Sequence, residues 1–153
     1  MIELPAVVVE AVRDLVPDHR ADRPVVERVV EMLAELPDLW DVNVSRWSND
    51  SATARFKEEA YQEPFVRFVK KVTTKPVVGV GRLTSADTMV SMVKKGVVDF
   101  IGGARPSIAD PFLPKKIEEG RIEDIRECIG CNMCVAYANH MVPMRCTDRK
   151  SVV

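Results

Sequence analysis

The chain has 153 residues, of which 46% are hydrophobic and 29% are charged, and its formal net charge at pH 7 is −1. This composition is typical of a globular domain, and the near-neutral charge gives no electrostatic reason to expect a nucleic-acid partner. The sequence shows no apolar run long enough to span a bilayer and no signal peptide at its start. We therefore expect a cytoplasmic protein without a membrane partner.

The first half of the chain alternates between helical and extended patterns. Apolar residues at helical spacing predict a helix over residues 22–36, and the β-rich alternation of "LWDVNVS" predicts a strand from Leu39 to Ser45. A second helix is expected to begin at Pro64, because proline suits a first helical position, and to end before Pro76.

The second half repeats this alternation. "VVGVG" predicts a short buried strand over residues 77–81, and Thr84 is the predicted N-cap of a helix that Gly96 closes. "VVDFIG" predicts another strand over residues 97–102, and one or two short helices are expected within residues 111–128. Strands that alternate with helices indicate βαβ units and a parallel sheet, which leaves a doubly wound sheet and a barrel both open.

Two of the predicted strands end in glycine followed by arginine. "VGVGR" ends at Gly81 and Arg82, and "IGGAR" ends at Gly103, Ala104 and Arg105. Glycine lets the backbone approach a phosphate closely, and arginine can bind that phosphate through two parallel hydrogen bonds. In (β/α)₈ barrels the loops after the seventh and eighth strands commonly build a phosphate site, which this pattern fits. The alternative is two tight turns with surface arginines.

The four cysteines follow the pattern C-x2-C-x2-C-x11-C, at Cys128, Cys131, Cys134 and Cys146. In a reducing compartment, clustered cysteines are more often metal ligands than disulfides. Three thiolates in one tight loop with a remote fourth are typical of a cubane [4Fe–4S] cluster. Structural zinc sites usually use two separated pairs, so zinc is the less favoured alternative and stays open.

Trp47 and Asp50 follow the first predicted strand, within "SRWSND". A tryptophan in a polar loop at the carboxyl end of a barrel strand would face the mouth of an active site. The simpler interpretation is a half-buried loop aromatic, and spacing alone favours that interpretation.

Several stretches together resemble one known family. "LWDVNVSRWSND", "KPVVGVGRLT", "GGARPSIADPFLPKKIEEGRIEDIRECIGCNMC" and Cys146 are similar to the trimethylamine, dimethylamine and histamine dehydrogenases and, more distantly, to the 2,4-dienoyl-CoA reductases. These are iron–sulfur flavoproteins of the old yellow enzyme superfamily. The resemblance covers about residues 38–147 and implies a partial TIM (β/α)₈ barrel, approximately the last three strands and their helices, followed by an iron–sulfur cluster loop.

The same resemblance implies a division of the chain. Residues 1–37 would be a helical remnant of the middle of the barrel, 38–126 the carboxyl-terminal part of an FMN-binding barrel, and 127–147 the cluster loop. The last residues, 148–153, read "DRKSVV", which resembles the translation of a common short-read sequencing adaptor. We expect that tail to be non-native.

The family also implies roles for individual residues. Arg105 matches the arginine that binds the FMN phosphate, and the residues that match positions lining the phosphate end of the flavin are Gly81, Arg82, Gly103 and Ala104. Cys128, Cys131, Cys134 and Cys146 match the [4Fe–4S] ligands. Trp47 matches an aromatic of the bowl that holds a substrate cation, and Asp50 a nearby active-site carboxylate.

By this resemblance the chain derives from an FMN- and [4Fe–4S]-dependent oxidoreductase, amine dehydrogenase-like, in which hydride passes to FMN and electrons then leave through the cluster to an acceptor protein. One alternative is a 2,4-dienoyl-CoA or enoate reductase, in which NAD(P)H supplies electrons and the small-molecule substrate is an enoyl compound rather than an amine. Another is a non-catalytic zinc or redox-carrier module. The parent could be an oligomer, and we expect these 153 residues alone to be inactive.

Overall fold

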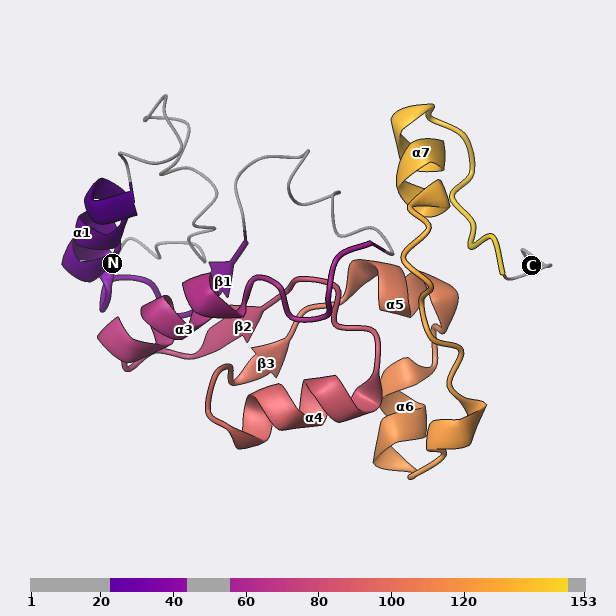
Figure 1. Cartoon of the computed structure of the whole chain (residues 1–153), viewed down its shortest axis with the longest axis horizontal. Helices are drawn as coiled ribbons and strands as arrows, with labels where there is room; N and C mark the ends of the chain where they lie inside the picture. The colour runs from indigo at the N-terminus through magenta and orange to yellow at the C-terminus, as the bar shows by residue number, and fades with distance from the viewer. Residues whose placement is uncertain (1–22, 44–55, 149–153) are drawn as a thin grey trace, which may run out of the picture.

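The computed structural model describes residues 23–43 and 56–148 (Figure 1). The backbone of these residues forms one three-stranded sheet. Its strands are β1 (Trp40–Val42), β2 (Val77–Gly79) and β3 (Phe100–Ile101).

The order of the strands in the sheet follows their order in the chain, β1-β2-β3. Both neighbouring pairs are parallel, and Val78 of β2 lies opposite both Asp41 of β1 and Phe100 of β3. A doubly wound sheet reverses its strand order at one point, whereas the three described strands run on without a reversal. This order occurs in a barrel wall and also in one half of a doubly wound sheet, and it confirms the expected partial α/β architecture with a parallel sheet.

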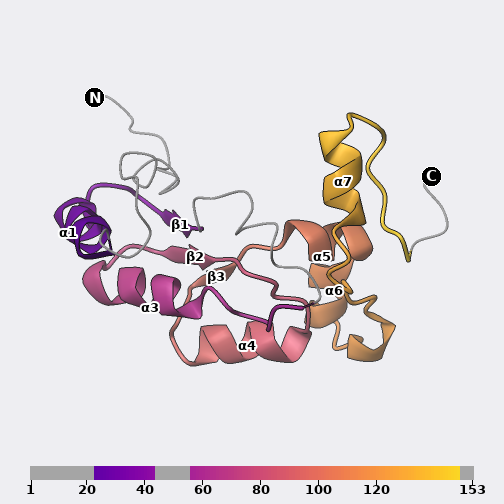
Figure 2. The same ribbon diagram turned by 45° about the horizontal axis from the view of Figure 1, so that its top comes forward.

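Helices cover one face of the sheet and continue beyond β3. The described helices are α1 (Arg23–Leu33), α3 (Glu63–Val72), α4 (Ala86–Lys94), α5 (Ala104–Ala109), α6 (Leu113–Glu118) and α7 (Met133–Asn139), with a 3₁₀ turn, η2 (Ile122–Asp124), after α6. Figure 2 shows α3 and α4 along the same face of the sheet, as parallel crossovers of one hand require. None of the helices in the described ranges has the length and apolar character needed to cross a bilayer.

The core lies between the sheet and α3. Trp40 and Val77 are 1% and 0% exposed, and they pack with Val66 and Val69 of α3 in one apolar cluster. Side chains two residues apart on a strand share a face, so Trp40 and Val42 both point toward the core. Asp41, which lies between them in β1, is therefore on the opposite face of the sheet. In a closed barrel that opposite face is the interior.

Tertiary hydrogen bonds explain why α1 ends earlier than the sequence predicts. The pattern predicts a helix to residue 36, but α1 ends at Leu33. The carbonyl oxygen of Ala34 accepts the indole N–H of Trp40 at 2.9 Å and the hydroxyl of Thr73 at 2.6 Å. These partners lie beyond the helix in the chain, so a local pattern does not reveal them.

The N-cap of α4 corrects a second expectation. Ser85, not Thr84, is the N-cap, and its side chain accepts the backbone N–H of Thr88 at 3.3 Å. The hydroxyl and the backbone N–H of Thr84 both donate instead to Glu59, the latter at 2.6 Å. The same carboxylate accepts the N–H of Ser85 at 2.7 Å and the hydroxyl of Thr88 at 2.7 Å. Glu59 therefore fastens the segment before α3 to the start of α4.

The Glu59 carboxylate is held in its charged form. Burial raises the pKa of Glu59, but the hydrogen bonds from Thr84, Thr88 and Ser85 outweigh burial and lower the pKa from 4.5 to about 2. Hydrogen bonds to a charged carboxylate favour that form. Because the folded pKa lies below the unfolded value, the stabilisation is fully present above pH 4.5 and is lost as the pH falls toward 2.

We expect Glu59→Gln to lower the free energy of unfolding at pH 7, because the amide carries no charge and one of its two polar atoms is a donor. The difference from the wild-type protein should shrink as the pH falls from about 4.5 to about 2. Urea unfolding across this pH range measures it. Glu58→Gln, a change at the exposed neighbour, is the matched control and should leave the pH profile of stability unchanged; equal behaviour of the two variants would contradict the assignment.

Candidate functional site

The ends of β2 and β3 lie side by side. The backbone N–H of Gly102 donates to the carbonyl oxygen of Gly79 at 2.9 Å, one step beyond the last paired residues. Because the two strands are parallel, the loops that follow them leave from the same edge of the sheet. The two Gly-Arg motifs are therefore neighbours in space, although about twenty residues separate them in the chain.

The turn after β2 places Arg82 in a strained backbone conformation. Gly81 has a φ of 120° and Arg82 a φ of 54°. A Cβ on Gly81 would lie 2.8 Å from Cγ of Gln62, so a larger residue does not fit there. The guanidinium of Arg82 donates through one terminal nitrogen to the carbonyl oxygen of Lys57. Its Nε is buried and has no hydrogen-bond partner, which is the feature expected of a group that meets an external anion.

Gln62 is a buried polar residue that sequence reasoning missed. Its side chain is fully buried, and its amide donates to the side-chain carbonyl of Asn43 at 3.2 Å and to the hydroxyl of Tyr61 at 2.8 Å. Asn43 directly follows β1, so Gln62 joins the end of β1 to the turn at Gly81. A glutamine just before Pro64 is unremarkable in a sequence, because its burial depends on packing beneath Gly81.

The loop after β3 leads into α5. Gly103 is the N-cap residue of α5, and Ala104 and Arg105 are its first two residues. The guanidinium of Arg105 donates to the side-chain carbonyl of Asn132, which lies between two of the cysteines. Arg105 thus lies between the carboxyl edge of the sheet and the cysteine loop.

The described part of the cysteine loop holds all four thiols free of disulfides. The N–H of Gly130 donates to Sγ of Cys128 at 3.4 Å, and Sγ of Cys131 lies 3.6 Å from the hydroxyl of Thr147. Thr147 directly follows Cys146, so the remote fourth cysteine is brought back toward the other three. Among residues 23–43 and 56–148, no group of three or more His, Cys, Asp or Glu side chains is already gathered as a metal-binding set.

Cys134 is the most protected of these thiols. It is the second residue of α7 and is 8% exposed. Burial raises the pKa of Cys134 most, the neighbouring Cys128 and Cys131 raise it further, and the N–H of Val135 and the Arg105 guanidinium oppose them. A thiol held neutral by burial becomes a thiolate when a metal binds, because a coordinating thiol is deprotonated.

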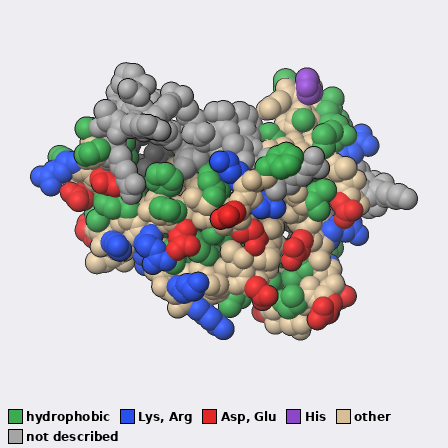
Figure 3. Space-filling view, viewed as in Figure 1, with side chains coloured by type: hydrophobic (Ala, Val, Ile, Leu, Met, Phe, Trp, Pro, Cys, Tyr) green, Lys and Arg blue, Asp and Glu red, His purple; other side chains and the backbone are tan. Residues whose placement is uncertain are grey.

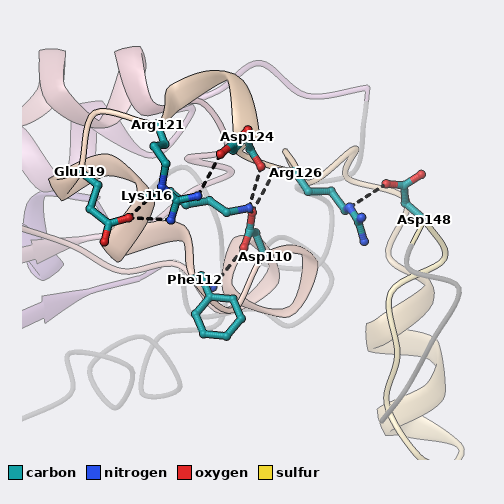
Figure 4. Close-up of polar contacts among 8 residues, drawn as sticks. All are labelled: Asp110, Phe112, Lys116, Glu119, Arg121, Asp124, Arg126 and Asp148. Atoms are coloured by element: carbon teal, nitrogen blue, oxygen red, sulfur yellow. Dashed lines mark hydrogen bonds and ion pairs between the residues drawn. The ribbon is translucent and has the colours of Figure 1, made fainter.

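A buried ion pair fixes the segment that leads into the cysteine loop (Figure 4). Asp110 is 5% exposed and accepts from Nζ of Lys116 at 2.6 Å, from the N–H of Phe112 at 3.1 Å and from the N–H of Arg126 at 3.0 Å. Nζ of Lys116 also donates to the carbonyl oxygen of Asp124 at 2.6 Å. Burial raises the pKa of Asp110, but Lys116 and the two backbone donors outweigh it and lower the pKa overall.

A second contact joins the segment before the cysteine loop to the residue just after it. Nε of Arg126 lies 3.6 Å from a carboxylate oxygen of Asp148, which Figure 4 shows beside α7. Arg126 precedes Cys128 and Asp148 follows Cys146, so the pair brings the two ends of the loop together. Both side chains are about half exposed, and an exposed pair of this kind contributes little free energy.

Several apolar side chains of this loop are exposed. They are Ile129, Met133, Met141, Val142 and Met144. Figure 3 shows hydrophobic side chains over α7, while acidic and basic side chains are interspersed across the rest of the visible face.

The sequence-predicted residues Trp47 and Asp50 lie outside the described residues.

The chain is similar to known proteins in sequence and in fold. Residues 11–124 match the model of the NADH:flavin oxidoreductase / NADH oxidase family. The chain is 47% identical over 125 residues to a dimethylamine dehydrogenase of Hyphomicrobium sp. (strain x). This match covers 79% of this chain and 17% of that protein. Among solved structures it resembles the histamine dehydrogenase of Rhizobium sp. 4-9, at 60% identity and a TM-score of 0.77, over 81% of this chain and 18% of the other.

A second solved structure is the 6-hydroxypseudooxynicotine amine oxidase of Pseudomonas geniculata N1, with 64% identity and a TM-score of 0.76 over 80% of this chain and 18% of the other. The chain therefore spans less than a fifth of the length of these three relatives. The family whose model matches is one of flavin oxidoreductases. The chain belongs to the NADH:flavin oxidoreductase / NADH oxidase family, within the old yellow enzyme superfamily.

We expect Lys116→Met to destabilise the protein by about 3 kcal/mol, because it leaves the buried carboxylate of Asp110 without its cation. Urea unfolding at pH 7 measures the loss. Lys115→Met is the matched control: Nζ of Lys115 lies 3.7 Å from Glu119, both side chains are exposed, and removal of the pair should cost less than about 0.5 kcal/mol. Equal losses in the two variants would show that the buried pair has no special role.

Proposed function

We propose that this chain forms part of an FMN- and [4Fe–4S]-dependent oxidoreductase that oxidises amines. The observation that carries the proposal is the shared edge of the sheet, where the hydrogen bond from Gly102 to Gly79 brings the two Gly-Arg loops together. The chain is 64% identical to an amine oxidase and 47% and 60% identical to two amine dehydrogenases, and this similarity supports amines as the substrate class.

The residues at this edge fit the phosphate end of FMN. Arg82 offers a buried Nε without a partner, and the turn at Gly81 has no room for a side chain. We propose that Arg105 and Arg82 bind the phosphate, and that Gly81, Gly103 and Ala104 let the backbone approach it. FMN held there supplies the hydride acceptor. The contribution of this chain is to fix the position of the cofactor and to neutralise its charge.

The cysteine loop fits a [4Fe–4S] cluster by its donor chemistry. The proposed ligands are Cys128, Cys131, Cys134 and Cys146. Their thiols are free, and the N–H of Gly130 already points at a ligand sulfur. Metal binding and local folding are commonly coupled at sites of this kind. A cluster supplies one-electron transfer to an acceptor.

The substrate residues proposed for this chain are Trp47 and Asp50. The face of an indole ring attracts an alkylammonium cation, and a nearby carboxylate adds charge complementarity. An amine bound in this way is held as a cation until its oxidation begins.

We expect the anaerobically purified protein to contain iron and acid-labile sulfide in equal amounts, about four of each per chain. Cys134→Ser should lose most of the iron and of the labile sulfide. It should also lose the absorbance shoulder at about 400 nm that marks such a cluster. Met133→Leu, a change at the adjacent position, is the matched control and should retain the cluster. Bound zinc without labile sulfide would instead support the zinc module.

We expect secondary alkylamines to bleach the flavin absorbance of the intact enzyme when mixed with it anaerobically. Trp47→Ala should raise KM for the amine about tenfold, the equivalent of about 1.4 kcal/mol of lost cation–π attraction, and Trp47→Phe should recover part of it. Steady-state kinetics measure both values. Oxidation of NADH coupled to reduction of an enoyl-CoA, with no bleaching by amines, would identify a reductase instead.

A further inference from the structure

Arg105 connects two regions that the proposed function assigns to different cofactors. It is the second residue of α5, directly after the end of β3, and it is half-buried. One terminal nitrogen of its guanidinium donates to the side-chain carbonyl of Asn132. A guanidinium carries five N–H groups in a rigid fork, so one side chain can contact groups on two sides.

Asn132 occupies a decisive position in the cysteine loop. Its φ is 59°, in the left-handed region, and it is the N-cap residue of α7. Asparagine tolerates this conformation better than most residues. The chain enters α7 here, between Cys131 and Cys134, so the conformation of Asn132 affects how these two thiols are oriented relative to each other.

We propose that Arg105 is a positioning residue for the iron–sulfur cluster: it anchors Asn132 and keeps a permanent positive charge beside the cluster ligands. The inference rests on the proposed function, and it adds a role in the cluster to a residue assigned there to the flavin phosphate. A cation near a cluster favours the reduced, more negative state and so raises the reduction potential. The same side chain makes the geometry of the cysteine loop depend on the end of β3.

The test measures two properties of the cluster in the anaerobically purified protein: its midpoint potential by redox titration, and the rate at which a chelator removes its iron. Arg105→Gln should shift the midpoint to a more negative value, because the charge is lost, and should accelerate iron loss about tenfold, as is usual for residues that orient metal ligands. Arg105→Lys keeps the charge but not the fork. It should retain the wild-type midpoint and still lose iron faster.

Arg82→Gln is the matched control. Arg82 also ends a strand at the proposed phosphate site, but its guanidinium donates to the carbonyl oxygen of Lys57 rather than to the cysteine loop. Both glutamine variants remove an arginine from the flavin phosphate, so only an effect specific to Arg105 reports on the cluster. Arg82→Gln should leave the midpoint potential and the rate of iron loss unchanged.

Asn132→Gly provides a second, independent variant, because glycine adopts the left-handed conformation freely and lacks the side-chain carbonyl that accepts from Arg105. It should accelerate iron loss as Arg105→Gln does, and the double variant should be no worse than either single one, since both remove the same contact. Additive losses, or equal midpoints in Arg105→Gln and Arg82→Gln, would overturn the inference. A wild-type protein without labile sulfide would instead overturn the proposed function.

Discussion

The pairing of β2 with a parallel strand on each side is the constraint on which the rest of this structure depends. Val78 lies opposite Asp41 on one side and Phe100 on the other, so the three strands share one direction and one register. Parallel strands send all their following loops to the same edge. The Gly-Arg turns, Asn43 and the start of α5 therefore meet there, although they come from distant parts of the chain.

Buried and half-buried polar side chains then fix those loops to one another. Glu59 holds the start of α4, Gln62 joins the end of β1 to Gly81, and Asp110 holds the segment that leads to the cysteines. Each of these side chains makes hydrogen bonds between separate elements of the chain. A hydrogen bond has a preferred direction, whereas an apolar contact does not. The core between the sheet and α3 supplies burial, whereas these polar groups determine where the loops lie.

The proposed chemistry depends on two sites, one at the ends of β2 and β3 and one in the cysteine loop. A flavin phosphate at the strand ends and a cluster in the following loop would lie on either side of Arg105, which contacts Asn132. Electron transfer needs cofactors that are close and held at fixed positions. The hydrogen bond from Arg105 to Asn132 would hold the cysteine loop beside the end of β3.

The sequence by itself determined the alternation of strands and helices, the family, and the residues that carry the proposed chemistry, because spacing and residue type are local properties. The two unpredicted helices, α5 and α7, have six and seven residues, too few for a periodic pattern to be distinct. Only the tertiary structure decided that Ser85 rather than Thr84 caps α4, that α1 ends at Leu33, and that Arg105 reaches Asn132. Each of these outcomes depends on a partner distant in the chain, and a hydrogen bond between distant residues leaves no periodic signal in the sequence.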